Sequence, residues 1–249
     1  MADSLKARLR HLANRVLNPL GLHLVRTSRA FEMDGLLQRA AARSTPIRTW
    51  IDVGASDGSW SLMARRHFPK ARNVLFEPLA ERQAALEGLR GSLGFVPIMA
   101  AAGAERGSIA FAIDDALDGS GVAAPGSERT RSVPVRTVDE VIVSQELPGP
   151  YGLKLDTHGH ELPVLAGSTI VLANCQLLVI EAYNFTLLPG SPRFHALAAW
   201  LEERGFRCCD IADPMRRPGD GVFWQVDLAF APKDSPIFAS SQFAASPGE

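Results

Sequence analysis

Short apolar runs alternate along the chain with stretches in which apolar residues recur every three to four positions. The short runs predict β-strands covered on both faces, because such strands carry few polar side chains; they are residues 48–53, 73–76, 95–99, 152–155 and 176–180. The stretches that follow them have the period of a helix; they are residues 59–68, 80–89, 137–145, 161–173 and a last one that begins at Ser191-Pro192 and ends at Gly205. Strand–helix alternation is typical of a parallel sheet with helices on both faces, so we predict an α/β, Rossmann-like domain.

Two segments depart from this alternation. Residues 108–113 and 131–136 are short strand candidates on either side of a polar, glycine-rich stretch, 114–130, which we interpret as a long loop. Long loops inside compact domains are more often functional than accidental. Near the C-terminus, only a turn-rich segment separates residues 206–211 from 222–230, which predicts an antiparallel pair of strands.

Acidic residues stand at the ends of the predicted strands. Asp52, Glu77, Asp156 and Glu181 each lie at or directly after the carboxyl end of a strand. In an open parallel sheet these ends meet at one edge, and ligands bind there where the strand order reverses. We therefore expect the functional site at this edge.

Composition and charge limit the class of protein. The 249 residues are 46% hydrophobic, which suits one α/β domain over residues 31–231 followed by a tail at 232–249. A formal net charge of -1 gives no overall basic field, so we expect no nucleic-acid partner. Three cysteines without a C-x-x-C pair indicate a reducing compartment rather than a disulfide framework. No apolar run approaches the roughly 20 residues of a membrane span and no secretory signal is apparent, so we predict a cytoplasmic protein.

Residues 1–30 differ from the rest of the chain in charge. Six basic residues stand against Asp3, a net charge of +5. Apolar residues recur there at helical spacing, at Leu5, Leu9, Leu12, Val16 and Leu17. We predict a basic amphipathic helix and a connector. Two roles stay open: packing against the main domain or a second subunit of a homo-oligomer, or peripheral contact with an anionic membrane surface.

The glycine-rich turn after the first predicted strand suits a nucleoside without phosphates. Gly54 and Gly58 allow a tight turn and close approach of a ligand. The lysine of a P-loop is missing, and the glycine spacing does not match a dinucleotide fingerprint. Glu77 can accept hydrogen bonds from two ribose hydroxyls, and nearby carboxylates would attract a sulfonium cation. The candidate cofactor-binding residues are Asp52, Gly54, Ala55, Ser56, Asp57, Gly58, Glu77 and Pro78.

The same segments resemble a known family of enzymes. Residues 50–58 and 76–78 are similar to the FkbM family of S-adenosylmethionine-dependent methyltransferases, and the resemblance continues at residues 135–139, 153–161, 164–167, 179–181 and 225–230. It implies a class I methyltransferase fold, with a mostly parallel seven-stranded sheet whose last strand is antiparallel. It also implies S-adenosylmethionine as cofactor and O-methylation of a sugar, a glycan or a secondary metabolite. The chain departs from the family pattern at Ser56 and at residues 157–160, where substrate chemistry is expected.

Three residues after the fourth main strand are candidates for the general base. A positioned base that takes the proton of a hydroxyl should assist methyl transfer to oxygen. Asp156, His158 and His160 are the catalytic candidates, and histidine is the natural base near neutral pH. Glu181 could face the acceptor. Asp156, Glu181 and a histidine could also ligate a divalent cation, but the sequence does not require one and we predict none.

Two other functions fit parts of the same pattern. A nicotinamide-dependent dehydrogenase fits the sheet but not the glycine spacing. A non-catalytic adenosine-binding module would keep the fold and the pocket. The predicted partner in the leading interpretation is a small-molecule or glycan acceptor.

Overall fold

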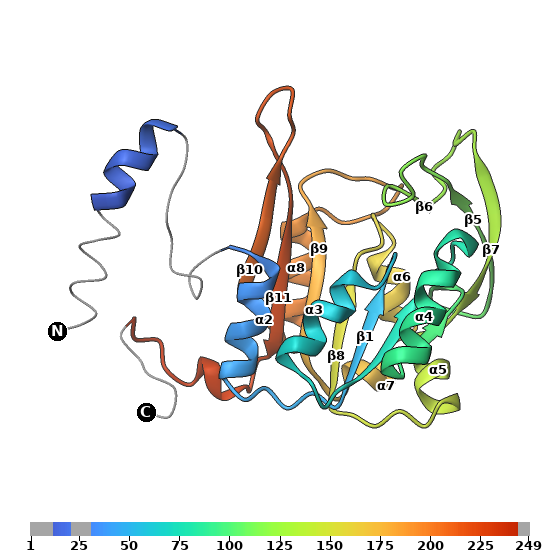
Figure 1. The fold of residues 1–249 in the computed structure, drawn as a ribbon, viewed down its shortest axis with the longest axis horizontal. Helices are drawn as coiled ribbons and strands as arrows, with labels where there is room; N and C mark the ends of the chain where they lie inside the picture. Colours follow the sequence, from blue (N-terminus) through green and yellow to red (C-terminus); the bar gives the residue numbers. More distant parts are fainter. Residues whose placement is uncertain (1–11, 21–30, 244–249) are drawn as a thin grey trace.

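The computed structural model describes residues 12–20 and 31–243. A seven-stranded sheet forms the centre of the molecule (Figure 1). The strand order is β10-β11-β9-β8-β1-β2-β3. The strands are β1 (Thr49–Val53), β2 (Arg72–Phe76), β3 (Val96–Ile98), β8 (Tyr151–Leu155), β9 (Cys175–Tyr183), β10 (Phe206–Arg216) and β11 (Phe223–Pro232). All pairs are parallel except those of β11, which is antiparallel to β9 and β10. The predicted sheet, including its antiparallel last strand, is confirmed.

Helices cover both faces of this sheet, which explains why β1 and β8 are buried along their whole length. On one face, Leu36 and Ala64 pack against Trp50 and Val179. On the other face, Val141, Leu165 and Leu201 pack against strands that include Ile51. The helices are α2 (Met33–Ala42), α3 (Ser59–His67), α4 (Gln83–Leu93), α5 (Val138–Ser144), α6 (Glu161–Ala166), α7 (Thr169–Leu172) and α8 (Phe194–Glu203). The sequence pattern did not predict α2.

Three predicted helices have bounds that differ by three or more residues. The one expected over residues 80–89 is the 3-10 turn η3 (Ala80–Arg82) followed by α4, which ends at Leu93. The helix expected over residues 161–173 is interrupted at Gly167, where a Cβ atom would lie 2.1 Å from the carbonyl oxygen of Gly103. The close contact with another segment divides it into α6 and α7. The helix expected from Ser191-Pro192 begins only at Phe194. Ser191 Oγ instead accepts hydrogen bonds from the backbone N–H groups of Leu187 and Leu188, so it closes the preceding loop.

A second, four-stranded sheet of order β4-β7-β5-β6 lies beside α4 (Figure 1). Its strands are β4 (Ala101–Ala102), β5 (Gly107–Ala112), β6 (Gly121–Val122) and β7 (Thr130–Arg136). The two strands predicted around residues 108–113 and 131–136 are confirmed as the antiparallel pair β5–β7. The long loop predicted between them contains β6. Leu117 and Asp118 in this loop reach the carboxyl edge of the main sheet.

The N-terminal prediction falls mostly outside the described residues. Residues 12–17 are helical, followed by the 3-10 turn η1 (Asn18–Leu20), and Leu12 and Val16 have exposed side chains. The remainder of the segment 1–30 is not among the described residues. Each helix within residues 12–20 and 31–243 is too short or too polar to span a bilayer. The domain boundaries at residues 30/31 and 231/232 stay predictions.

Candidate active site

A cavity of about 180 Å³ opens at the carboxyl ends of β1, β2 and β8. The main-sheet side of its wall comes from strand ends and the turns after them. The loop between β5 and β7 supplies the opposite side. Among its lining residues are Gly54, Ser56, Glu77, Asp118, Asp156, Thr157, His158 and His160. The edge predicted from the acidic strand ends is therefore hollow.

The turn after β1 is shaped by residues with positive φ. Gly54 has φ +79°, and a Cβ atom there would lie 2.0 Å from the backbone oxygen of Asp156. The turn thus passes directly against the end of β8. Gly58 has φ +85°, and a Cβ there would meet the Leu89 side chain at 2.3 Å. Glycine is needed at both positions, at the first for close approach to β8 and at the second for packing against α4.

Glu77 lies in the wall of the cavity although it is only 5% exposed. Its Oε2 atom accepts a hydrogen bond from the backbone N–H of Ser56 at 2.9 Å, and Oε1 accepts one from Leu79 at 2.9 Å. These bonds hold the carboxylate at the mouth of the glycine turn. Each oxygen keeps a further lone pair that can accept from a ligand hydroxyl. Burial raises the pKa of the Glu77 carboxyl above its ordinary value.

The other predicted cofactor residues surround the cavity rather than line it. Asp52 is completely buried, accepting a hydrogen bond from Ser61 Oγ at 2.7 Å and pairing with Lys154 at 3.2 Å. Asp57 is exposed and accepts the backbone N–H of Ser59, at the start of α3. Outside the lining are Asp52, Ala55, Asp57, Gly58 and Pro78. In this geometry these residues support the turn, whereas Gly54, Ser56 and Glu77 face the space where a ligand can enter.

Lys154 is a buried cation that joins two strands. Its ammonium group lies 3.2 Å from Asp52 Oδ1 and 3.2 Å from Asp156 Oδ2, and it donates to the Gly54 carbonyl at 2.9 Å. Burial lowers the pKa of Lys154, but the two carboxylates outweigh this effect and raise it above its ordinary value. A lysine in a buried strand needs a partner, and the sequence suggests Glu181 on a neighbouring strand. That suggestion is wrong, because the structure pairs Lys154 with Asp52 and Asp156 instead. In a parallel sheet Lys154 lies beside Asp52 in register, and both point to the same face.

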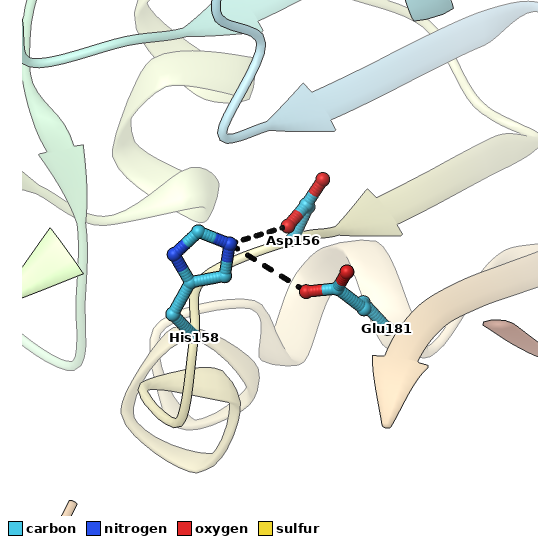
Figure 2. A group of neighbouring side chains, drawn as sticks. All are labelled: Asp156, His158 and Glu181. Carbon is cyan, nitrogen blue, oxygen red and sulfur yellow. Dashed lines mark ion pairs between the residues drawn. The ribbon is translucent and has the colours of Figure 1, made fainter. Parts of the chain in front are cut away.

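Asp156, His158 and Glu181 converge at the ends of β8 and β9 (Figure 2). His158 Nε2 lies 3.3 Å from Asp156 Oδ1 and 3.6 Å from Glu181 Oε2. Burial opposes the charged form of the imidazole, but the carboxylates raise the pKa of His158 to about 9. Burial and the neighbouring Asp156 carboxylate raise the pKa of Glu181 to about 8. Despite its burial, Asp156 has a pKa well below its usual range because Lys154 and His158 favour its charged form.

His160 has different surroundings from His158, although the same short loop carries both. It lies at the N-terminal cap of α6 and borders the cavity described above and a second cavity of about 400 Å³. No side chain in the described part of the chain hydrogen-bonds to its ring, and burial lowers its pKa. Buried Glu161 accepts hydrogen bonds from the Gly159 N–H and the Thr157 hydroxyl, which fixes the loop.

Several residues at the site were not predicted. Asp118, in the long loop, accepts hydrogen bonds from Ser56 Oγ at 2.8 Å and from Arg82 at 2.6 Å. Tyr183 and Gln225 both donate to the Glu181 carboxylate. The sequence signalled only that a long loop in this region is functional. No local pattern indicates which of its residues reaches the turn after β1.

The fold and the site together define a class of protein. The strand order, with antiparallel β11 inserted between β9 and β10, is that of a class I methyltransferase fold, and the cavity lies at its ligand-binding edge. The model of the methyltransferase FkbM domain matches residues 52–208. The chain therefore belongs to the FkbM methyltransferase family. This confirms the resemblance seen in the sequence and S-adenosylmethionine as the cofactor, and it replaces the dehydrogenase alternative.

One curated relative is the hexuronic acid methyltransferase AglP from Haloferax volcanii, 28% identical over 139 residues. The match covers 53% of this chain and 54% of the relative, so about half of each protein is compared. A methyltransferase FkbM structure from Methylobacillus flagellatus KT has a TM-score of 0.48 at 15% identity, covering 73% of this chain and 43% of that one. The putative tRNA (m1A22) methyltransferase Sp1610 of Streptococcus pneumoniae, in complex with S-adenosyl-L-methionine, has a TM-score of 0.43 at 13% identity, covering 79% and 72%.

Proposed function

We propose that this methyltransferase transfers the methyl group of S-adenosylmethionine to a hydroxyl oxygen of a sugar, a glycan or a secondary metabolite. The observation that carries the proposal is the position of Glu77. Its carboxylate faces the cavity beside the turn after β1, at Gly54 and Ser56. A carboxylate there can accept hydrogen bonds from both ribose hydroxyls of a nucleoside. The name of the relative AglP supports a sugar acceptor.

The charges around the cavity favour the proposed cofactor. Glu77, Asp118 and Asp156 line it, and of the lining cations Arg82 is paired with Asp118 while His158 faces Asp156. This excess of negative charge attracts a sulfonium and an ammonium group and repels a pyrophosphate. When bound, S-adenosylmethionine supplies an electrophilic methyl carbon.

His160 is the residue that we propose as general base. Its ring borders both cavities and has no hydrogen-bonding side chain in the described residues, so it is free to meet an acceptor hydroxyl. In the transfer the hydroxyl oxygen forms a bond to the methyl carbon as the carbon–sulfur bond breaks, and the hydroxyl proton passes to His160. His158 Nε2 instead faces Asp156 and Glu181. Asp156 and His158 are the competing assignments.

Calorimetry with S-adenosylmethionine, NAD and ATP tests the cofactor, and methyl incorporation from labelled S-adenosylmethionine into candidate sugars tests the reaction. We expect binding of S-adenosylmethionine alone. Glu77→Gln should weaken it about 10- to 100-fold, since hydrogen bonds to a charged group are worth about 1.5–3 kcal/mol. Glu81→Gln, an exposed glutamate paired with Arg131, is the matched control and should bind normally.

Two outcomes would contradict the proposal. If Glu77→Gln binds S-adenosylmethionine as tightly as the native chain does, Glu77 does not hold the ribose of the cofactor. Cofactor binding without methyl incorporation into any hydroxyl acceptor would favour the non-catalytic adenosine-binding module.

A further inference from the structure

The geometry points to a divalent metal site formed by Asp156, His158 and Glu181 at the acceptor side of the cavity. This inference rests on the proposed function for its role in catalysis, but the binding of the ion can be tested separately. Figure 2 shows the three side chains directed toward one another from the end of β8, the following loop and the end of β9.

The spacing of the donor atoms suits a common ion. His158 Nε2 lies 3.3 Å from Asp156 Oδ1 and 3.6 Å from Glu181 Oε2, and one donor atom of each residue lies within 4.8 Å of the others. Nitrogen and oxygen ligands that bind one metal at about 2.1 Å lie roughly 3.0–3.4 Å apart when they are adjacent. Only small side-chain movements are therefore needed to bind an ion between them.

Surrounding hydrogen bonds hold the two carboxylates in this orientation. Lys154 contacts the outer oxygen of Asp156, Oδ2, which leaves Oδ1 directed toward His158. Tyr183 and Gln225 donate to the two oxygens of Glu181. Ligating carboxylates in metal sites are oriented in the same way by outer hydrogen bonds. The two carboxylates are therefore held in place before a ligand binds, unlike flexible side chains on the surface.

The crowding of carboxyl groups also favours a dication, which would replace the protons on its ligands. Asp227 lies directly opposite Glu181 across the β9–β11 pair, so its side chain is on the same face of the sheet. The side chain of Asp227 makes no hydrogen bond or ion pair within residues 12–20 and 31–243. The nearby cation Lys154 is shared between Asp156 and Asp52. Three carboxylates are thus gathered where the protein supplies one shared ammonium and one imidazole.

The site is open on the side where an acceptor would bind. Asp156 and His158 line the cavity, so an ion held by three protein ligands keeps positions for water or substrate, as catalytic metal sites do. Two carboxylates with one imidazole suit an ion such as Mn²⁺ or Mg²⁺. The ion would bind the acceptor hydroxyl and favour loss of its proton, which His160 takes up.

The test measures Mn²⁺ binding to the chelator-treated full chain, by loss of the electron paramagnetic resonance signal of free Mn²⁺. We expect one ion per chain, and at least about tenfold weaker binding for Glu181→Gln and for His158→Ala. The matched control is His67→Ala, which removes an imidazole that lies 2.9 Å from Asp34 and is in no group of three ligands among the residues that the structure describes. Its Mn²⁺ affinity should be unchanged. Circular dichroism and thermal melting check that each variant is folded.

The outcomes separate the metal site from the proposed function. No binding of Mn²⁺ at millimolar concentration, or unchanged affinity in both ligand variants, would overturn the site. Binding in the native chain with equal methyl transfer in the presence of a chelator would overturn its catalytic role and leave the proposed function standing. Failure of the chain to bind S-adenosylmethionine would remove the proposed function, whatever the result with Mn²⁺.

Discussion

Glu77 is nearly buried yet borders an open cavity, and this burial makes the charge of its carboxyl group sensitive to pH. The sequence placed this carboxylate at the end of a strand, 23 residues after Gly54. The structure adds the two backbone N–H groups that hold it and the burial that raises its pKa.

Cofactor affinity should fall in mildly acidic solution. The form of Glu77 that accepts ribose hydrogen bonds on both oxygens is the charged one, and its pKa is raised, so the affinity is complete above that pKa and lost as the pH falls through it. The decline should begin at higher pH than for an ordinary glutamate of pKa 4.5. Calorimetry across pH measures it. Glu77→Gln should bind weakly with no such decline, and an equal decline in that variant would assign the effect to another group.

Gly54 should tolerate no side chain. In Gly54→Ala the new Cβ would lie 2.0 Å from the Asp156 oxygen, in addition to the strain of φ +79°. Gly94→Ala is the matched control, because Gly94 also has positive φ, +69°, but its Cβ meets no atom within 4 Å. The control should cost about 1–2 kcal/mol of unfolding free energy. Gly54→Ala should cost at least about 2 kcal/mol more and weaken cofactor binding; equal losses in denaturant unfolding would refute the close approach.

The short loop between β8 and α6 is the element that separates the roles of two histidines. Glu161 fixes this loop from inside through Gly159 and Thr157. As a result His158 faces the carboxylates of Asp156 and Glu181, while His160 borders both cavities.

Substitution of His160 should affect the chemical step and not cofactor binding. We expect His160→Ala to lower kcat about 10²- to 10⁴-fold, the usual contribution of a general base, with an unchanged Kd for S-adenosylmethionine. His195→Ala, an exposed histidine on α8, is the control. Steady-state kinetics with calorimetry measures both quantities. If His160→Ala has the same kcat as the native chain, His160 is not the general base, and Asp156 or His158 is the candidate instead.

For the whole molecule, Lys154 joins the two central strands β1 and β8 below the cavity. Its contacts with Asp52, Asp156 and Gly54 connect the support of the glycine turn to the catalytic edge. A change at this position should therefore affect global stability as well as the site.

Lys154→Met should destabilise the protein by about 3–5 kcal/mol, because it leaves the buried carboxyl groups of Asp52 and Asp156 without their ammonium partner. Lys233→Met removes an exposed pair with Glu202 and should cost no more than about 1 kcal/mol. Chemical denaturation followed by circular dichroism gives both values. Equal effects of the two substitutions would show that the buried ion pairs contribute little to the stability of the fold.

The short helices and the active-site contacts show where local pattern stops being informative. Apolar periodicity could not show that Gly103 approaches Gly167 and divides α6 from α7, since that contact joins segments far apart in the chain. For the same reason the sequence did not predict that Asp118 binds Ser56, or that Lys154 pairs with Asp52 and Asp156 rather than Glu181.

The sequence by itself determined the α/β class, the antiparallel end of the sheet, the glycine turn and the acidic residues at four of the strand ends, because periodicity and turn chemistry are local properties. Only the tertiary structure decided which of those residues face the cavity: Glu77, Gly54 and Ser56 line it, whereas Asp52 lies behind it. The direction of a side chain and the partner of a buried charge depend on strand register and on loops from distant segments. Neither is encoded within a few residues of the group concerned.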